Sequence, residues 1–150
     1  MTLKERLQSE TTAAMRSGDS LRRDTLRMVH SSAYNLEKKS GTPLTDEEFL
    51  AVFAREVKTR RESVEAFRKG GREDLASKEE AEIAILGEFL PEQLNEAEIG
   101  HLIDQAVTAT GAATPRDLGK VMGWLAPHTR GRADGKLVST LVAARLSGPG

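Results

Sequence analysis

The chain has 150 residues, a formal net charge of −1, a sequence pI near 6.3 and no cysteine. This length fits one large domain or two small ones, and the lack of cysteine excludes disulfides, zinc sites with thiolate ligands and a cysteine nucleophile. No apolar run approaches the ~20 residues that span a membrane, and the charged start MTLKERLQSE does not resemble a secretory signal. We therefore expect a cytoplasmic protein with no membrane partner.

Apolar residues recur at helical spacing through the first part of the chain and predict four helices. Thr45 and Glu48 form a capping box for the third helix, because the hydroxyl can accept the Glu48 amide while the carboxylate reaches back. Glycines end the first three helices, and Pro91 closes the fourth. The predicted helices occupy residues 3–17, 21–40, 46–69 and about 74–90, with Ser20 as a possible cap of the second.

The same signals recur on a smaller scale in the second part of the chain. Asn95 and Glu98 form another capping box, and Thr114 is a cap before Pro115 at the first helical position. Asp134 can cap the last helix. These signals predict helices at residues 96–110, 115–126 and 135–146, followed by a frayed tail over residues 147–150.

The sequence predicts an all-α fold, because no run of β-branched residues alternates with polar ones. The predicted helices form two groups, and residues 91–95 separate them. We expect an N-terminal domain of about four helices over residues 1–93 and a compact three-helix domain over residues 94–150.

Positive charge is concentrated around the turn before the last helix. Residues 113–146 hold six Lys or Arg and two acids, a net charge of +4, which leaves −5 for the rest of the chain. A basic segment on an acidic chain indicates an anionic partner, and nucleic acid is the first candidate. Arg presents a planar fork to phosphate, Lys presents a mobile charge, and glycine lets a backbone come close. The predicted nucleic-acid contacts are Lys120, Arg130, Gly131, Arg132, Gly135 and Lys136.

A plainer interpretation of the same turn is a solvated connection whose glycines only satisfy backbone geometry. Gly119 and Gly123 on the preceding helix each cost up to ~1 kcal/mol relative to Ala. Close packing of the last helix against these glycines is the structural explanation, and close approach of an RNA backbone is the functional one. Trp124 is expected to be half-buried against the helices rather than to stack on a base.

Charged residues of both signs also interleave over residues 55–73. Glu56 and Arg60 are an i,i+4 pair of the kind that stabilises an exposed helix by a few tenths of a kcal/mol. We expect this stretch, and the acids at residues 79–82, to be solvated helix surfaces. The three histidines show no spacing typical of metal ligands, and no metal or other cofactor is expected.

Four sequence segments stand out along the chain: GREDL at 71–75, EIAILGEFLPEQL at 82–94, GKVMG at 119–123 and GRADGKLV at 131–138. With these segments the chain resembles the GatB/YqeY family, which comprises free-standing YqeY-like proteins and the tail domain of the B subunit of glutamine-dependent tRNA amidotransferase. The order and spacing of these segments follow the family over nearly the whole chain, and LPEQL is characteristic of the YqeY branch. The resemblance implies an all-helical, two-part fold.

The resemblance also implies a partner, because this module contacts tRNA in the amidotransferase and aids tRNA binding in some bacterial glutaminyl-tRNA synthetases. We expect a tRNA-binding accessory module, alone or beside an aminoacyl-tRNA synthetase or amidotransferase complex. One alternative is a helical protein-interaction module of the translation machinery. Another is carbon–nitrogen ligase activity, with glutamine as amido donor, only within a larger complex. No catalytic residue is assigned, because the sequence shows no nucleophile elbow, Walker loop or paired acid and base.

Overall fold

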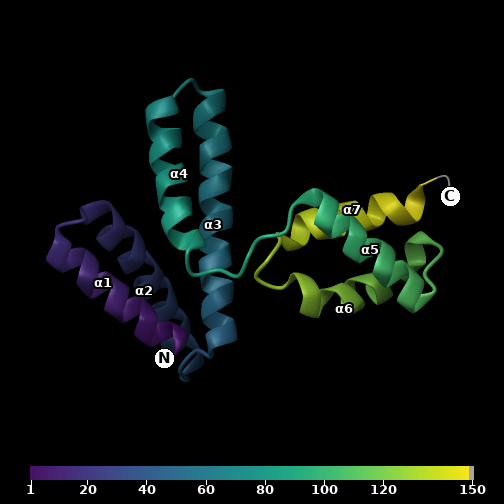
Figure 1. The fold of residues 1–150 in the computed structure, drawn as a ribbon, viewed down its shortest axis with the longest axis horizontal. Helices are drawn as coiled ribbons and strands as arrows, with labels where there is room; N and C mark the ends of the chain where they lie inside the picture. Colours follow the sequence, from purple (N-terminus) through teal and green to yellow (C-terminus); the bar gives the residue numbers. More distant parts are fainter. Residues whose placement is uncertain (149–150) are drawn as a thin grey trace. The chain divides into compact units, whose positions relative to one another are not determined.

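The computed structural model describes residues 1–148, and within them the chain forms seven α-helices and no strand. The sequence prediction of an all-α fold is therefore confirmed. The chain divides into two compact units, which we call unit 1 (Met1–Leu90) and unit 2 (Pro91–Gly150) (Figure 1). The helices are α1 (Leu3–Ser17), α2 (Ser20–Ser40), α3 (Asp46–Lys69) and α4 (Glu73–Gly87) in unit 1, then α5 (Glu96–Thr110), α6 (Leu118–Thr129) and α7 (Gly135–Ser147) in unit 2.

Side-chain caps set where most of these helices begin. Thr45 accepts the amide of Glu48, whose carboxylate accepts the amide of Thr45 in return, and this completes the predicted capping box. Asn95 and Glu98 form the same reciprocal pair at the start of α5. The helix starts that were predicted from these boxes are confirmed.

Unit 1 buries the apolar faces of two helical hairpins, α1–α2 and α3–α4. The rings of Phe53 and Phe89 stack at its centre with centroids 4.8 Å apart. The guanidinium of Arg6 lies over the Phe89 ring at 4.5 Å, which adds a cation–π contact at the edge of this core. The fully buried members of this core include Leu7, Leu26, Val29, Phe49, Phe53 and Leu86.

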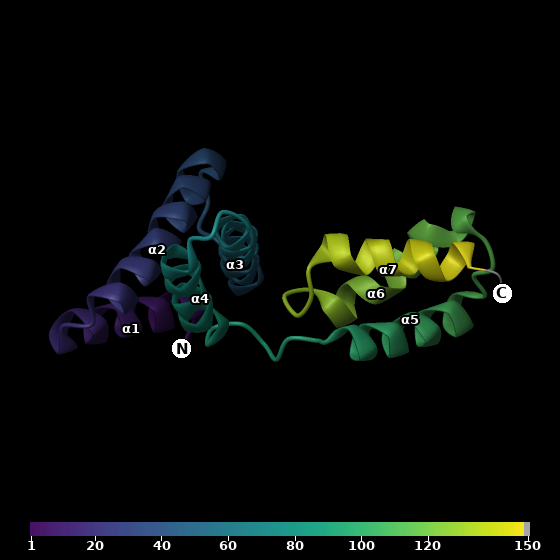
Figure 2. The same cartoon turned by 90° about the horizontal axis from the view of Figure 1, so that it is seen from above.

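Unit 2 is a three-helix arrangement in which α6 and α7 lie side by side over α5 (Figure 2). Its core is aliphatic, with no aromatic ring among the fully buried residues. The turn at residues 130–134 joins α6 to α7 at one end of this unit. The fully buried side chains are Ile99, Ala106, Val121, Leu125, Val138 and Val142.

Two helix ends differ from the sequence prediction. α4 ends at Gly87 rather than at Leu90, because the next three amides bond to carbonyls three residues back and Pro91 disfavours the helical conformation for the residue before it. α6 continues to Thr129, beyond the expected stop at Pro127, and it is preceded by a short 3₁₀ turn at Pro115–Asp117. Of the frayed tail predicted for residues 147–150, Ser147 still belongs to α7, and residues 149–150 lie outside the described part of the chain.

The expectation of a solvated ion-pair surface on α3 is wrong for Arg60, which is only 5% exposed. Its guanidinium donates to the carboxylates of Glu56 at 2.6 Å and Glu82 at 2.8 Å, and so it ties α3 to α4. Burial lowers the pKa of Arg60, but the hydrogen bonds to these two glutamates outweigh that effect and raise it. The same network shields Glu82, at 15% side-chain exposure, from the solvent in which it was expected to lie.

Candidate nucleic-acid interface

The turn between α6 and α7 is held in one conformation by its own backbone. The amides of Arg132 and Ala133 both donate to the carbonyl oxygen of Thr129, at 2.9 and 3.1 Å. Gly131 has a φ of +75°, which is strained for a residue with a side chain. Backbone geometry is therefore sufficient to explain glycine at this position.

A second segment of unit 2 lies along this turn. The amide of Leu94 donates to the carbonyl oxygen of Arg132 at 2.8 Å. The side-chain amide of Gln93 donates to the carbonyl oxygen of Gly131, also at 2.8 Å. Residues 91–94 and 131–132 are thus joined by several hydrogen bonds. Both segments were recognised as family motifs from the sequence, but nothing in the sequence indicated that they bond to each other.

Arg132 supports the conformation of this turn through its side chain. Its Nε donates to the carbonyl oxygen of Glu92 at 3.1 Å, and its Nη1 donates to the carbonyl oxygen of His128 at 3.4 Å. The residue is half-buried as a result. Arg132 and Gly131 thus take part in the hydrogen bonds that hold the turn.

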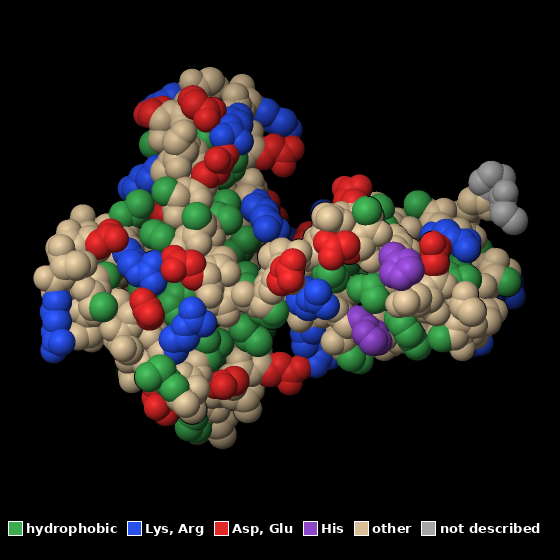
Figure 3. Space-filling view, viewed as in Figure 1, with side chains coloured by type: hydrophobic (Ala, Val, Ile, Leu, Met, Phe, Trp, Pro, Cys, Tyr) green, Lys and Arg blue, Asp and Glu red, His purple; other side chains and the backbone are tan. Residues whose placement is uncertain are grey.

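Three other predicted cations lie at the surface of unit 2. Arg130 and Lys136 are at the turn, and Lys120 is in the first turn of α6, about 15 Å away along the helix. The side chain of Lys120 is 67% exposed, and its ammonium lies 4.0 Å from the carboxylate of Asp117. At that distance and exposure an ion pair is weak. Basic, acidic and histidine side chains all appear on the visible face of unit 2 (Figure 3).

The start of α7 is capped by the protein itself. The carboxylate of Asp134 accepts the amide of Lys136 at 3.4 Å, which confirms the predicted cap. A phosphate at this helix end would have to compete with Asp134 for the amide, so the exposed side chains carry the attraction for anions. Gly135 has no atom within 4 Å of a side-chain position, and it leaves the surface beside Lys136 open.

The close-packing explanation for Gly119 and Gly123 is wrong. A Cβ atom at either position would have no heavy atom within 4 Å, and both glycines are exposed. Helix packing therefore does not offset their cost in helix propensity. Pro127 has no N–H, so the carbonyl of Gly123 also lacks its usual helical donor.

Trp124 and His128 form a stacked pair on α6. Their ring centroids are 4.4 Å apart, with 23° between the planes. Trp124 is half-buried against the core of unit 2, as predicted, whereas His128 is exposed. Only the i,i+4 spacing of the two residues in the sequence indicated that these rings could meet.

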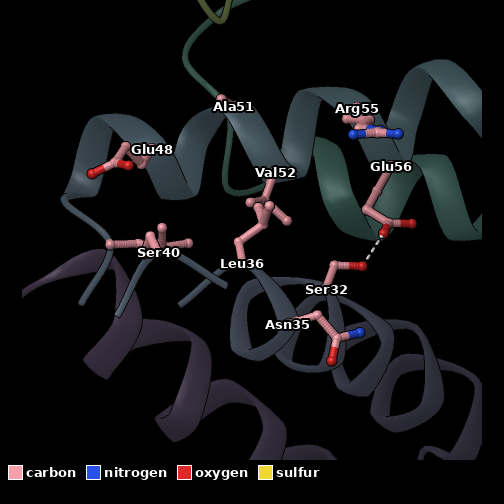
Figure 4. A pocket seen from close by; sticks show the side chains of 10 residues that line it. Ser32, Asn35, Leu36, Ser40, Glu48, Ala51, Val52, Arg55 and Glu56 are labelled. Atoms are coloured by element: carbon pink, nitrogen blue, oxygen red, sulfur yellow. Dashed lines mark hydrogen bonds between the residues drawn. The ribbon is translucent and has the colours of Figure 1, made fainter. Parts of the chain in front are cut away.

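Unit 1 carries a groove of about 710 Å³ between α2 and α3 (Figure 4). Its floor includes Leu36 and Val52, and the hydroxyl of Ser32 donates to the Glu56 carboxylate at 2.6 Å across it. Arg55 lines the rim and makes no ion pair with any residue from 1 to 148. The groove therefore combines an apolar floor with one cation and two carboxylates, those of Glu48 and Glu56.

Two further kinds of feature, a metal site and a membrane-spanning helix, are absent from the described residues. Over residues 1–148, no group of three or more His, Asp or Glu side chains could hold a metal ion. No helix in that range is both long enough and apolar enough to cross a bilayer.

Comparison with known proteins gives a family assignment. The model of the family described as Yqey-like protein matches residues 4–146. A protein of Pyrenophora tritici-repentis named "Altered inheritance of mitochondria protein 41, mitochondrial" is 31% identical over 137 residues, which cover 89% of this chain and 75% of that protein. A protein of the same name from Lachancea thermotolerans is 27% identical over 147 residues, covering 93% and 79% of the two chains. An uncharacterized protein of Schizosaccharomyces pombe is 41% identical over 68 residues, covering 45% and 55%. With its helical motifs in family order and the family model spanning nearly its whole length, the chain belongs to the YqeY-like protein family.

Proposed function

We propose that this protein is an accessory module that binds tRNA through the α6–α7 end of unit 2. The observation that carries the proposal is the set of exposed cations along α6 and at the start of α7, Lys120, Arg130 and Lys136, within a segment of net charge +4 on a chain of net charge −1. Positive charge concentrated in one segment of an acidic chain favours a polyanion. The module acts without a catalytic centre of its own, and carbon–nitrogen ligase activity would arise only in a larger complex.

The six predicted contact residues take different roles in this proposal. Lys120, Arg130 and Lys136 contact phosphates, whereas Arg132 and Gly131 fix the conformation of the turn that carries Arg130. Gly135 leaves room for an RNA backbone beside Lys136. This division follows from exposure and from the hydrogen bonds that Arg132 already makes.

A binding titration of purified protein against bulk tRNA at several salt concentrations tests the proposal. With about three phosphate contacts, log K should fall with log salt at a slope of roughly −2 to −3. The triple variant K120E/R130E/K136E should abolish binding. Its control is K38E/K39E/R61E in unit 1, which changes the net charge equally at exposed residues that form no ion pairs within residues 1–148. Equal affinity of the two variants for tRNA would refute the proposal.

A second candidate function, docking of a partner protein, is favoured by the groove of unit 1. The apolar floor at Leu36 and the cation Arg55 fit an amphipathic helix that carries a carboxylate next to its apolar face. In that case the pure protein would not bind tRNA, and a partner would still be recovered after nuclease treatment. Recovery would be lost in Leu36→Asp and in Arg55→Glu.

The tRNA-binding candidate places the protein where tRNA is used, which is the cytoplasm or, as the names of two relatives suggest, mitochondria. Fractionation of the source cells, with one marker enzyme confined to the cytosol and one confined to mitochondria, distinguishes the two.

A further inference from the structure

The Trp124–His128 pair forms a fixed aromatic surface on α6. Trp124 is anchored in unit 2 by its contacts with the core, and it covers one face of the His128 imidazole at a centroid distance of 4.4 Å. His128 is exposed, so the face turned away from Trp124 is open to solvent. The imidazole therefore presents a flat ring whose orientation is already set.

Exposed cations precede and follow this surface along the chain. Lys120, Trp124 and His128 follow one another at i,i+4 spacing, so they lie along one side of α6 over about 12 Å. Arg130 is the C-cap of α6, two residues after His128. A nucleotide chain that runs along α6 past His128 would therefore meet a cation before and after the ring.

The helix backbone between the cations is also accessible. Nothing lies within 4 Å of a side-chain position at Gly119 or Gly123. A ligand lying along α6 would therefore meet no side chain at these two positions.

We infer that His128, supported by Trp124, is a stacking platform for one unpaired nucleobase of RNA, with the neighbouring phosphates held by Lys120 and Arg130. This inference rests on the RNA-binding function proposed above and adds that the recognised part of the RNA is single-stranded. Unpaired bases stack on His and other aromatic side chains, whereas bases inside a duplex present no free face. An acidic peptide would use the cations but would gain little from a flat ring.

The test compares His128→Leu, which removes the flat ring, with His128→Phe, which keeps it. The probes are a ten-nucleotide single-stranded RNA and an RNA duplex with the same number of phosphates. The ratio of single-strand to duplex affinity should fall about tenfold in His128→Leu and stay within about twofold of the original in His128→Phe, since stacking of one base contributes ~1–3 kcal/mol. The salt slope should be the same in both variants, because neither removes a phosphate contact.

The emission of Trp124 gives a second readout, because it is the sole tryptophan. The single strand should change this emission at saturation, and the duplex should leave it unchanged. If RNA binds with the same affinity ratio to His128→Leu and Trp124 does not respond, the stacking inference is overturned while the RNA-binding function stands. If no RNA binds the original protein, both fail. Displacement of the single strand by polyglutamate at equal charge would also overturn the inference, since it would show that charge alone selects the ligand.

Discussion

The amide of Leu94 donates a hydrogen bond to the carbonyl oxygen of Arg132, and the two segments that meet there are both family motifs. Arg132 adds to this contact by donating from its side chain to the carbonyl of Glu92. The position of the basic turn thus depends on a segment distant from it in sequence. Arg132 therefore stabilises the conformation of the turn, and this role does not depend on whether Arg132 also contacts an anion.

Replacing Arg132 should therefore destabilise unit 2. Arg132→Ala is expected to lower the free energy of unfolding by about 1–2 kcal/mol, because it removes two hydrogen bonds from a charged donor. Arg132→Lys should restore little of this, since a single ammonium cannot reproduce the geometry of the guanidinium fork. Urea unfolding followed by Trp124 emission measures unit 2 specifically. The matched control is Arg116→Ala, which alters an exposed arginine of the same unit, and equal losses in the two Ala variants would contradict this role.

Local signals accounted for most of the fold. Capping boxes and glycine stops depend on residues within one turn of each other, and so the starts at Thr45 and Asn95 could be predicted from the sequence. The end of α4 was missed because the chain changes to 3₁₀ bonding before Pro91, a choice between two similar turn geometries that the residue pattern does not resolve.

The candidate site was less predictable, because its details depend on contacts between distant segments. A sequence shows that Arg132 is basic, but not that its donors are occupied by backbone carbonyls. Likewise, the i,i+4 spacing of Glu56 and Arg60 is the same for an exposed pair and for a pair covered by α4. Helical periodicity alone does not show which element packs against a helix face, because that depends on the tertiary structure.

The glycines of the basic turn should respond differently to the same substitution. Gly131→Ala places a side chain at a φ of +75° and should cost about 1–2 kcal/mol. Gly135→Ala meets open space at the first residue of α7, where φ is not positive, and should be neutral or slightly stabilising. Thermal unfolding of the two variants by circular dichroism measures the difference. A loss in Gly135→Ala as large as that in Gly131→Ala would show that space rather than backbone conformation limits the turn.

Gly119 and Gly123 should be replaceable with a gain in stability. Each change to Ala is expected to stabilise α6 by up to ~1 kcal/mol, because the added methyl group meets no neighbour and helix propensity improves. Trp124 emission during urea unfolding again measures the effect. If Gly123→Ala gains stability but loses affinity for single-stranded RNA, the glycine serves ligand approach; a loss of stability would instead reveal a packing role.

Removing the cation from the buried network of unit 1 should be costly. Arg60→Ala leaves the carboxylates of Glu56 and Glu82 close together without their cation, and we expect a loss of about 3 kcal/mol. Arg60→Met combined with Glu56→Gln and Glu82→Gln should recover much of that loss, because the two carboxylates closest to the guanidinium then carry no charge; Glu79, 3.9 Å from Arg60, keeps its charge at the edge of the network. Urea unfolding by circular dichroism, with Trp124 emission as the internal reference for unit 2, measures these variants. Equal recovery in Arg60→Met alone, with both glutamates kept, would attribute the effect to volume rather than to charge.

Asp117 should make the free energy of unfolding of unit 2 depend on pH in the acidic range. Its carboxylate accepts the amides of Ala113 at 2.8 Å and Thr114 at 3.1 Å, and these hydrogen bonds lower the pKa of Asp117 in the folded protein. The unfolded chain therefore takes up the proton first as the pH falls, so this stabilisation is complete above the ordinary carboxyl value of about 3.9 and is lost as the pH falls through the lowered value.

Asp117→Asn tests this dependence, because the amide keeps an acceptor oxygen but does not titrate. The variant should be less stable than the original at pH 7 and should lose less stability between pH 5 and pH 2, as measured by urea unfolding with Trp124 emission. Glu96→Gln serves as the control, since it removes an exposed carboxylate of the same unit and should leave the steep acid dependence in place. An unchanged pH profile in Asp117→Asn would show that the backbone amides of this turn do not depend on the charged carboxylate.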